Sequence, residues 1–307
     1  MNGSTKNSKQ GFLNFVLLFM ALLSLGCASA SGASQGLPTD GEGPDRPMRG
    51  QAGGFFNLAL ASLGAGDYPM AIQSLNSALA EDPAHYVLYW YRGVAYYFLQ
   101  DFEKALENYD RSIELNPGYA GSYQNRGNIY MITGRSAEAL ADFDRAIDLD
   151  PSPDNYYNRG DLYSRLDRQE EALADLNTAI DLNPRLIDAH RERGKIFFSR
   201  QNYEGAGQDF EAELGINPQD VEARFYLGNS LLILGDILGA VEQYTQVIAA
   251  APNGSAAYGR RGFAYLLLNN FPQARKDLIR AVELRPDNPD LPAFIEFYSR
   301  ATGESLF

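Results

Sequence analysis

A 34-residue period runs through residues 52–288 and constrains the fold of this chain more than any other feature. Glycine stands at repeat position 8 in six copies, as Gly93, Gly127, Gly160, Gly194, Gly228 and Gly262. Alanine stands at position 20 in every copy, as Ala71, Ala105, Ala139, Ala172, Ala206, Ala240 and Ala274. Proline stands at position 32 in every copy, as Pro83, Pro117, Pro151, Pro184, Pro218, Pro252 and Pro286. Residue types that recur at the same repeat positions indicate one array of stacked units, although the length of the chain alone would suggest about two domains.

The pattern resembles the tetratricopeptide repeat, a 34-residue helix–turn–helix unit. In the clearest copy, residues 86–119, the resemblance is carried by Tyr89, Gly93, Tyr96, Ala105, Tyr109 and Pro117. The resemblance implies an all-α fold, a right-handed superhelical solenoid of seven helix–turn–helix repeats. We expect these repeats, of which the third is one residue short, at residues 52–85, 86–119, 120–152, 153–186, 187–220, 221–254 and 255–288.

Each recurring residue type has a physical role in such a unit. Glycine and alanine let the two helices of one repeat approach closely, and aromatic residues fill the space between neighbouring helices. Proline cannot continue a helix, so it fixes the turn to the next repeat. No single repeat buries its apolar face, and stacking supplies the shared core.

The last segment, residues 289–307, is predicted to form a helix that caps the seventh repeat. Its apolar residues Leu291, Phe294, Ile295 and Tyr298 share one face at helical spacing.

The first 27 residues are predicted to be an export signal. Lys6 and Lys9 precede an apolar run from Phe12 to Gly26. This run is shorter than the ~20 apolar residues that a membrane-spanning helix needs, so it fits the core of a signal peptide.

A lone cysteine ends the apolar run and resembles the lipid-attachment cysteine of bacterial lipoproteins. The resemblance rests on Gly26, Cys27 and Ala28, and it implies that Cys27 carries the lipid at a new N-terminus. Two alternatives are an ordinary secretory signal cut near Ala28–Ala30 and an uncleaved short anchor. Residues 28–51, rich in glycine, serine and proline, are predicted to be a flexible tether.

The charge and the scarcity of reactive residues exclude several function classes. The net charge is −13, which argues against nucleic acid as a partner because phosphate binding needs a cationic face. Removal of residues 1–26 would take away two lysines and change the net charge to −15. One cysteine excludes a disulfide framework and a zinc cluster of cysteines, and two histidines leave little for a metal site.

In the family that the chain resembles, the first helix of each repeat lines a concave binding groove, mainly through positions 2, 5, 6, 9, 12 and 13. The candidate peptide-binding residues at or near these positions are Phe56, Trp90, Tyr91, Tyr97, Gln124, Asn125, Asn128, Tyr157, Asn158, Arg191, Lys195, Phe225, Tyr226, Asn229 and Arg260. Aromatic side chains offer contact area at low entropic cost, and amides can bond to a peptide backbone. Trp90 is the best anchor candidate, and packing between repeats is its alternative role.

A carboxylate-gripping groove, known in this family, is not expected here. Asn128 and Asn158 match its asparagine positions. However, Gln124, Asp188 and Glu192 stand where that groove needs cations.

Several charged residues are predicted to be structural. Arginine at position 7 occurs in five repeats, as Arg92, Arg126, Arg159, Arg193 and Arg261. We expect each to lie along the next repeat and to pair with an acid there. Glu213 replaces a small residue at position 27, and a buried lone carboxylate is costly, so we expect it to have a partner such as Arg193. His190 replaces the usual tyrosine at position 4 and is predicted to be a packing residue.

These observations predict a protein-binding scaffold or adaptor, lipid-anchored in the bacterial cell envelope, that binds a peptide or a partner helix in its groove. The alternative is a structural assembly factor that acts in a secretin or pilus complex or by self-association, with Leu306 and Phe307 docking into a neighbouring copy. The sequence contains no phosphate-binding loop, nucleophile elbow or zinc-protease motif, so neither an enzyme nor a cofactor is expected.

Overall fold

The computed structural model describes residues 47–307, and within this range the chain forms fifteen helices and no strands. The expected all-α fold is therefore confirmed. The predicted signal at residues 1–27, the candidate lipidation site Cys27 and most of the predicted tether lie outside the described residues.

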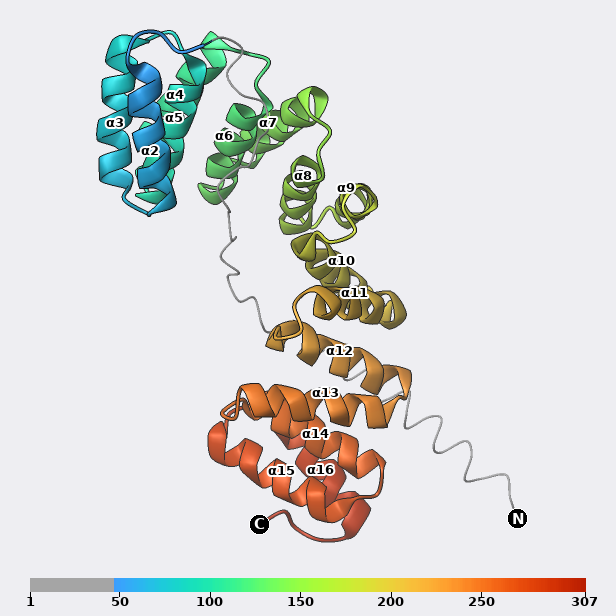
Figure 1. The fold of residues 1–307 in the computed structure, drawn as a ribbon. Helices are drawn as coiled ribbons and strands as arrows, with labels where there is room; N and C mark the ends of the chain where they lie inside the picture. Colours follow the sequence, from blue (N-terminus) through green and yellow to red (C-terminus); the bar gives the residue numbers. More distant parts are fainter. Residues whose placement is uncertain (1–46) are drawn as a thin grey trace. The chain divides into compact units, whose positions relative to one another are not determined.

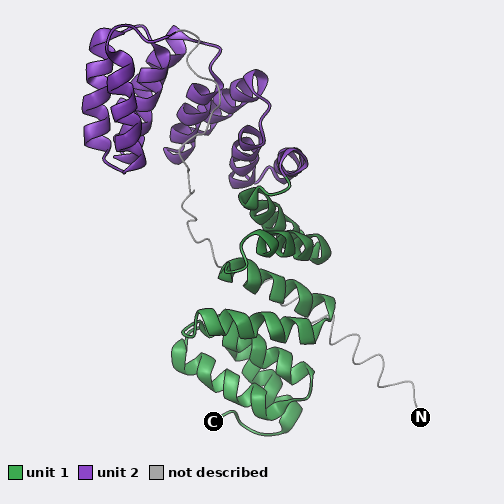
Figure 2. Cartoon of the chain, in the orientation of Figure 1, with its two compact units in different colours: residues 1–30, 184–307 green, residues 31–183 purple. Residues whose placement is uncertain are grey.

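The chain divides between residues 183 and 184 into two compact units (Figure 2). The described part of the N-terminal unit contains α2 (Ala52–Gly64), α3 (Tyr68–Glu81), α4 (Tyr86–Phe98), α5 (Phe102–Leu115), α6 (Ala120–Ile132), α7 (Ser136–Leu149), α8 (Pro153–Arg165) and α9 (Gln169–Leu182). The C-terminal unit contains α10 (Ile187–Ser199), α11 (Tyr203–Ile216), α12 (Val221–Leu234), α13 (Ile237–Ala250), α14 (Ser255–Leu267), α15 (Phe271–Leu284) and α16 (Leu291–Thr302).

The helices up to α15 are arranged as seven pairs, and each pair lies within one copy of the 34-residue period (Figure 1). We call the even-numbered helices α2–α14 the first helices and the odd-numbered helices α3–α15 the second helices. The turn inside every pair contains one residue with a left-handed backbone, at repeat position 15. These residues are Gly66, Gln100, Gly134, Asp167, Gln201, Gly235 and Asn269. Only three are glycine, so the sequence pattern alone did not reveal this constraint.

A close approach of the two helices forms the core of each pair. The alanine at position 20 is fully buried in every repeat. A side chain at position 8 would collide with the second helix: a Cβ atom built on Gly127 would lie 2.8 Å from Cε1 of Phe143. The glycine and alanine pattern therefore has the role predicted from the sequence.

A partly buried network of arginine and aspartate joins the two helices of a pair and, in four of the seven repeats, also reaches the preceding pair. Arg126 donates from Nε and Nη2 to both carboxylate oxygens of Asp142, at 2.8 and 2.7 Å, and from Nη1 to Asp110 at 2.6 Å. Asp142 belongs to the second helix of the same repeat and Asp110 to that of the preceding repeat. The rings of Tyr123 and Tyr130 lie 5.7 and 5.8 Å from the guanidinium carbon, within the range of a cation–π interaction.

The same arrangement recurs along both units, and we call it the arginine ladder. Arg159 binds Asp175 and Asp144 in the same geometry. The remaining links are Arg92 to Asn108 and Asn76, Arg193 to Asp209, and Arg261 to Asp277 and Thr245. The expectation of a structural role for these arginines agrees with this finding. The expected direction was wrong, because Arg92, Arg126, Arg159 and Arg261 reach the preceding repeat and not the next one.

The C-terminal helix α16 packs beside α14 and α15 (Figure 1). Leu291, Phe294 and Tyr298 are buried there, and the ring of Phe294 stacks on Phe263 at 4.8 Å between centroids. Leu306 is only 1% exposed in the same core, whereas Phe307 is 73% exposed. The predicted docking of Leu306 into a second copy is therefore wrong, because this side chain already packs within its own unit.

We predict that replacing a ladder arginine by lysine destabilises the array although the charge is kept. Arg159→Lys removes the paired hydrogen bonds to Asp175, and the loss in free energy of unfolding should be about 1–3 kcal/mol. The matched control is Arg168→Lys, whose partner Glu171 lies on the surface and whose cost should stay below about 0.5 kcal/mol. Urea unfolding followed by circular dichroism measures both. Equal losses would contradict the structural role of the ladder.

Candidate functional site

The structure places all fifteen predicted groove residues on first helices, but only some of them are accessible to a partner. In the N-terminal unit the partly exposed members are Phe56, Tyr91, Tyr97, Gln124, Asn125, Tyr157 and Asn158. We call these seven residues the amide–aromatic face. They come from α2, α4, α6 and α8. A single unit thus presents aromatic rings and amide groups along consecutive first helices.

Trp90 does not belong to this face, and its assignment as an anchor is corrected. Its side chain is 1% exposed and packs edge-on against Tyr91 and Tyr119, at 4.6 and 5.6 Å between ring centroids. Position 5 of this repeat faces the neighbouring pair, so the largest side chain of the array fills the space between them. The alternative stated for Trp90, packing between repeats, is the one observed.

Two predicted amides are also buried. Asn128 is 4% exposed, and Asn229 accepts a hydrogen bond from the hydroxyl of Tyr244 at 2.8 Å. Both stand at position 9, which points toward the interior of these repeats. Asn125, by contrast, is partly exposed while hydrogen-bonded to Tyr109. Internal bonding of this kind fixes the orientation of an amide that also reaches the surface.

The predicted residues of the C-terminal unit are engaged in internal contacts. Arg260 pairs with Asp290 at 2.8 Å and lies over the ring of Phe294, so it holds the start of α16. Tyr226 stacks on Phe210 with 5.2 Å between centroids, and Phe225 packs on Tyr244. Arg260 and these rings are thus less available to contact a partner, because they already make contacts within the unit.

Arg191 and Lys195 lie in a charged cluster on α10. Arg191 donates to Asp188 at 2.8 Å, to Asp220 at 3.1 Å and to Glu213. The expected pairing of Glu213 with Arg193 is corrected, because Arg193 is occupied by Asp209 within the ladder. Burial raises the pKa of Glu213 to about 7, although Arg191 opposes this shift.

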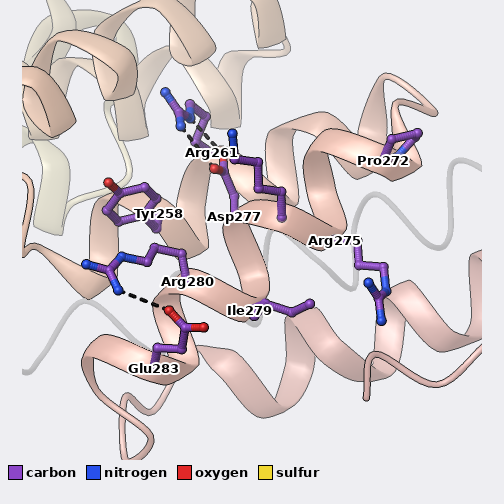
Figure 3. A pocket seen from close by; sticks show the side chains of 9 residues that line it. Tyr258, Arg261, Pro272, Arg275, Asp277, Ile279, Arg280 and Glu283 are labelled. Atoms are coloured by element: carbon purple, nitrogen blue, oxygen red, sulfur yellow. Dashed lines mark hydrogen bonds and ion pairs between the residues drawn. The ribbon is translucent and has the colours of Figure 1, made fainter.

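A pocket of about 800 Å³ lies on α14 and α15 of the C-terminal unit (Figure 3). Its charged lining residues are Arg261, Arg275, Lys276, Asp277, Arg280 and Glu283. Figure 3 shows two internal pairs, Arg261 with Asp277 and Arg280 with Glu283. Sequence reasoning missed this pocket. Six of its nine lining residues are charged, and four of these six are paired with one another.

Neither a metal centre nor a membrane span is found in the part of the chain that the structure describes. Across residues 47–307, no three histidine, cysteine, aspartate or glutamate side chains are grouped so that they could hold a metal ion. No helix in that same range has the length and hydropathy needed to cross a bilayer.

His190 has the structural role that the sequence predicted. Its Nδ1 lies 2.8 Å from Asp209 and its Nε2 lies 3.1 Å from the carbonyl of Pro184. Other repeats use a tyrosine for this second bond, as in the hydroxyl of Tyr123 that donates to the carbonyl of Pro117. The hydrogen bond to Asp209 raises the pKa of His190, and the Pro184 carbonyl adds to this shift, while burial opposes it.

Comparison with known proteins identifies the repeat. Family models described as tetratricopeptide repeat match residues 91–119, 120–153 and 225–289, and a model described as TPR repeat matches residues 160–199. These matches together cover more than half of the 307 residues.

Curated relatives and solved structures agree with these matches. The DnaJ homolog subfamily C member 7 homolog of Dictyostelium discoideum is 28% identical over 126 residues, which are 40% of this chain and 23% of that protein. The chain therefore spans less than a quarter of that relative's length.

Two solved structures share the fold. The C-terminal part of a TPR repeat-containing protein from Cytophaga hutchinsonii gives a TM-score of 0.63 at 19% identity, covering 78% of this chain and 99% of that one. PilW, described as a widely conserved type IV pilus biogenesis factor, gives 0.59 at 22% identity, covering 66% and 94%. At these identities the likeness establishes the fold alone.

We predict that the charged form of His190 stabilises the C-terminal unit. Because the folded pKa is raised, this contribution is complete below the unfolded pKa of about 6.5 and disappears as the pH rises through the folded pKa. His190→Gln should therefore cost more stability at pH 5.5 than at pH 8.5, measured by urea unfolding. A cost that does not change with pH would contradict the bond between a charged His190 and Asp209.

Proposed function

Because this chain belongs to the tetratricopeptide repeat family, we propose that it is a protein-binding scaffold that holds an extended segment of a partner protein. Proteins of this family mediate protein–protein interactions. One observation carries the proposal: the amide–aromatic face leaves rings and amides partly exposed on four consecutive first helices.

The chemistry of this face suits a peptide backbone. Gln124, Asn125 and Asn158 each carry a donor and an acceptor, and a peptide group offers the matching pair. Phe56 and Tyr91 meet edge-to-face with 5.1 Å between centroids, and Tyr97 packs on Phe98 and Phe102. These rings are held in place before binding, so a partner would order few side chains when it docks.

The second helices of the same unit offer a contrasting surface. Their exposed residues include the acids Asp110 and Asp144, which are already paired with ladder arginines, and Arg111, which is paired with Glu114. A partner that binds here must compete with existing ion pairs. The first helices are therefore the better docking side of the unit.

We further propose that the protein is exported and lipid-anchored through Cys27 in the bacterial cell envelope. The support is the order of the sequence: two lysines, an apolar run, Gly26–Cys27–Ala28 and then a stretch rich in glycine, serine and proline. A single lipid chain anchors a protein only marginally, so stable attachment would require more than one chain on Cys27.

The alternative function is a structural assembly factor in a secretin or pilus complex or in a homo-oligomer. The fold shared with PilW is the observation that favours the pilus version, and it concerns the fold alone. For the self-association version, Leu306 is buried within its own unit and only Phe307 of the two proposed contact residues is exposed. We propose no catalytic activity and no cofactor for either role, in keeping with a family that is generally non-enzymatic.

We predict that the amide–aromatic face binds peptides. Peptides selected by phage display on the full chain should bind the double variant Gln124→Ala with Tyr157→Ala at least tenfold more weakly, as loss of interface anchors typically costs more than about 1 kcal/mol each. The control is Glu107→Ala with Asp148→Ala on the second helices α5 and α7, where both side chains are exposed. Fluorescence anisotropy measures the affinities. Unchanged binding by the first variant would refute this face as the docking site.

We predict that intact protein purified from membranes begins at Cys27 with a lipid-sized mass increase, as seen by mass spectrometry. Cys27→Ala should remove that mass and prevent cleavage at this position. An unmodified N-terminus near residues 28–30 would instead establish an ordinary secretory signal.

A further inference from the structure

Seven charged side chains gather where α10, α11 and α12 pack in the C-terminal unit. We call this group the acidic cluster. Its five carboxyl groups and two cations are Asp188, Glu192, Glu213, Asp220, Glu222, Arg191 and Lys195. Six of the seven lie on the first helices α10 and α12 or at the residue before α12.

The two cations do not neutralise the five acids. Arg191 is shared among Asp188, Glu213 and Asp220. Lys195 lies between Glu192 and Glu222, at 3.7 and 3.3 Å, which is too long for two good hydrogen bonds. The outermost acids, Asp188 and Glu222, keep 39% of their side-chain surface exposed. The cluster therefore presents a surplus of negative charge to the solvent.

Glu213 gives independent evidence that the cluster is incomplete. Its side chain is fully buried and is directed at Arg191, which binds Oε1. Its Oε2 has no hydrogen-bond partner. A buried carboxylate oxygen without a hydrogen-bond donor costs free energy. An additional positive charge nearby would reduce this cost.

We propose that the acidic cluster binds a lysine or arginine side chain of the partner protein, so that the partner is basic where it contacts α10 and α12. Charge complementarity identifies this occupant: the exposed carboxylates Asp188 and Glu222 lie on adjacent first helices, and the cations beside them, Arg191 and Lys195, are each shared with other acids of the cluster. An acidic or phosphorylated segment would meet repulsion, because both cations of the cluster are already engaged. The inference rests on the proposed function, since it assigns a chemistry to the same partner.

Proton release by Glu213 provides a signature of binding at this cluster. The groups around its carboxyl are Arg191 and Lys195, whose charges lower its pKa, and Asp220, whose charge raises it, and burial brings the pKa to about 7. A bound cation favours the ionised form, so binding should release protons and grow stronger as the pH rises. If the cation lowers this pKa by one unit, affinity increases about fivefold between pH 6 and pH 8.

The test uses the full chain and a synthetic 12-residue peptide with alternating lysine and glycine, with glutamine replacing lysine in the control peptide. Isothermal titration calorimetry at pH 6 and pH 8 measures affinity and, in two buffers, proton release. We expect binding of the lysine peptide to strengthen several-fold at pH 8 with proton release. Glu213→Gln should abolish this dependence. Since Glu213→Gln leaves His190 intact, a pH dependence that persists in it would assign the effect to His190 and overturn the inference.

Location is tested by a pair of charge-matched variants. Asp188→Asn with Glu222→Gln should weaken the lysine peptide about five- to tenfold. Glu204→Gln with Glu211→Gln removes the same charge from exposed positions on α11 and should change affinity less than twofold.

Equal losses in the two variants would mean that the acidic protein attracts the peptide non-specifically, and would overturn the inference. That failure is distinct from failure of the proposed function. If only the inference fails, display-selected peptides that depend on Gln124 and Tyr157 would still bind. If the proposed function fails, they would not.

Discussion

The arginine ladder is the interaction on which the rest of this structure depends. The ladder arginines are partly buried, and four of them donate both to their own repeat and to the preceding one: Arg92, Arg126, Arg159 and Arg261. A buried ion pair contributes little unless all its donors are used, and Arg126 and Arg159 use theirs on two carboxylates each. The ladder thereby fixes the spacing of neighbouring pairs in the N-terminal unit, and of the last two pairs in the C-terminal unit, through a geometry that lysine cannot reproduce.

The ladder also decides which surface of each unit remains for binding. It engages polar groups of the second helices, among them Asp110 and Asp144, in pairs that a ligand would have to break. The first helices are free of this network at positions 5 and 6. In the N-terminal unit those positions carry aromatic and amide groups, and in the C-terminal unit the fifth repeat carries Arg191 and Glu192. The two units therefore present different chemistry on equivalent helices.

The sequence predicted the fold well because steric constraints leave a regular trace. A glycine that must admit an aromatic ring, as Gly127 admits Phe143, recurs at the same position in almost every copy. The prediction of individual contacts was weaker where several partners lie within reach. Arginine at position 7 could extend toward either neighbouring repeat. Its partner in the preceding repeat stands at position 25, and this residue varies among aspartate, asparagine and threonine. Arg191 and Arg193 were both candidate partners of Glu213. Arg193 binds Asp209 within the ladder, and Glu213 pairs with Arg191.

Burial of single side chains was the least predictable property. Trp90 stands at a position that faces the groove in the family pattern, yet its size makes it the natural filler between two pairs. Asn128 and Asn229, at position 9, are likewise buried although they were predicted to line the groove. Their neighbours Gln124, Asn125 and Asn158 were predicted as surface groups, and they are partly exposed. The two buried amides stand at repeat position 9, whereas the partly exposed ones stand at positions 5 and 6.

The central claim is that a partner segment lies on the first helices, and photo-cross-linking tests it most directly. A photo-reactive phenylalanine analogue in place of Tyr157 on α8 should form a cross-link to a display-selected peptide or to the native partner. The same analogue in place of Asp148 on α7, an exposed position on a second helix, should form none. Cross-linking through α7 and not through α8 would contradict the account.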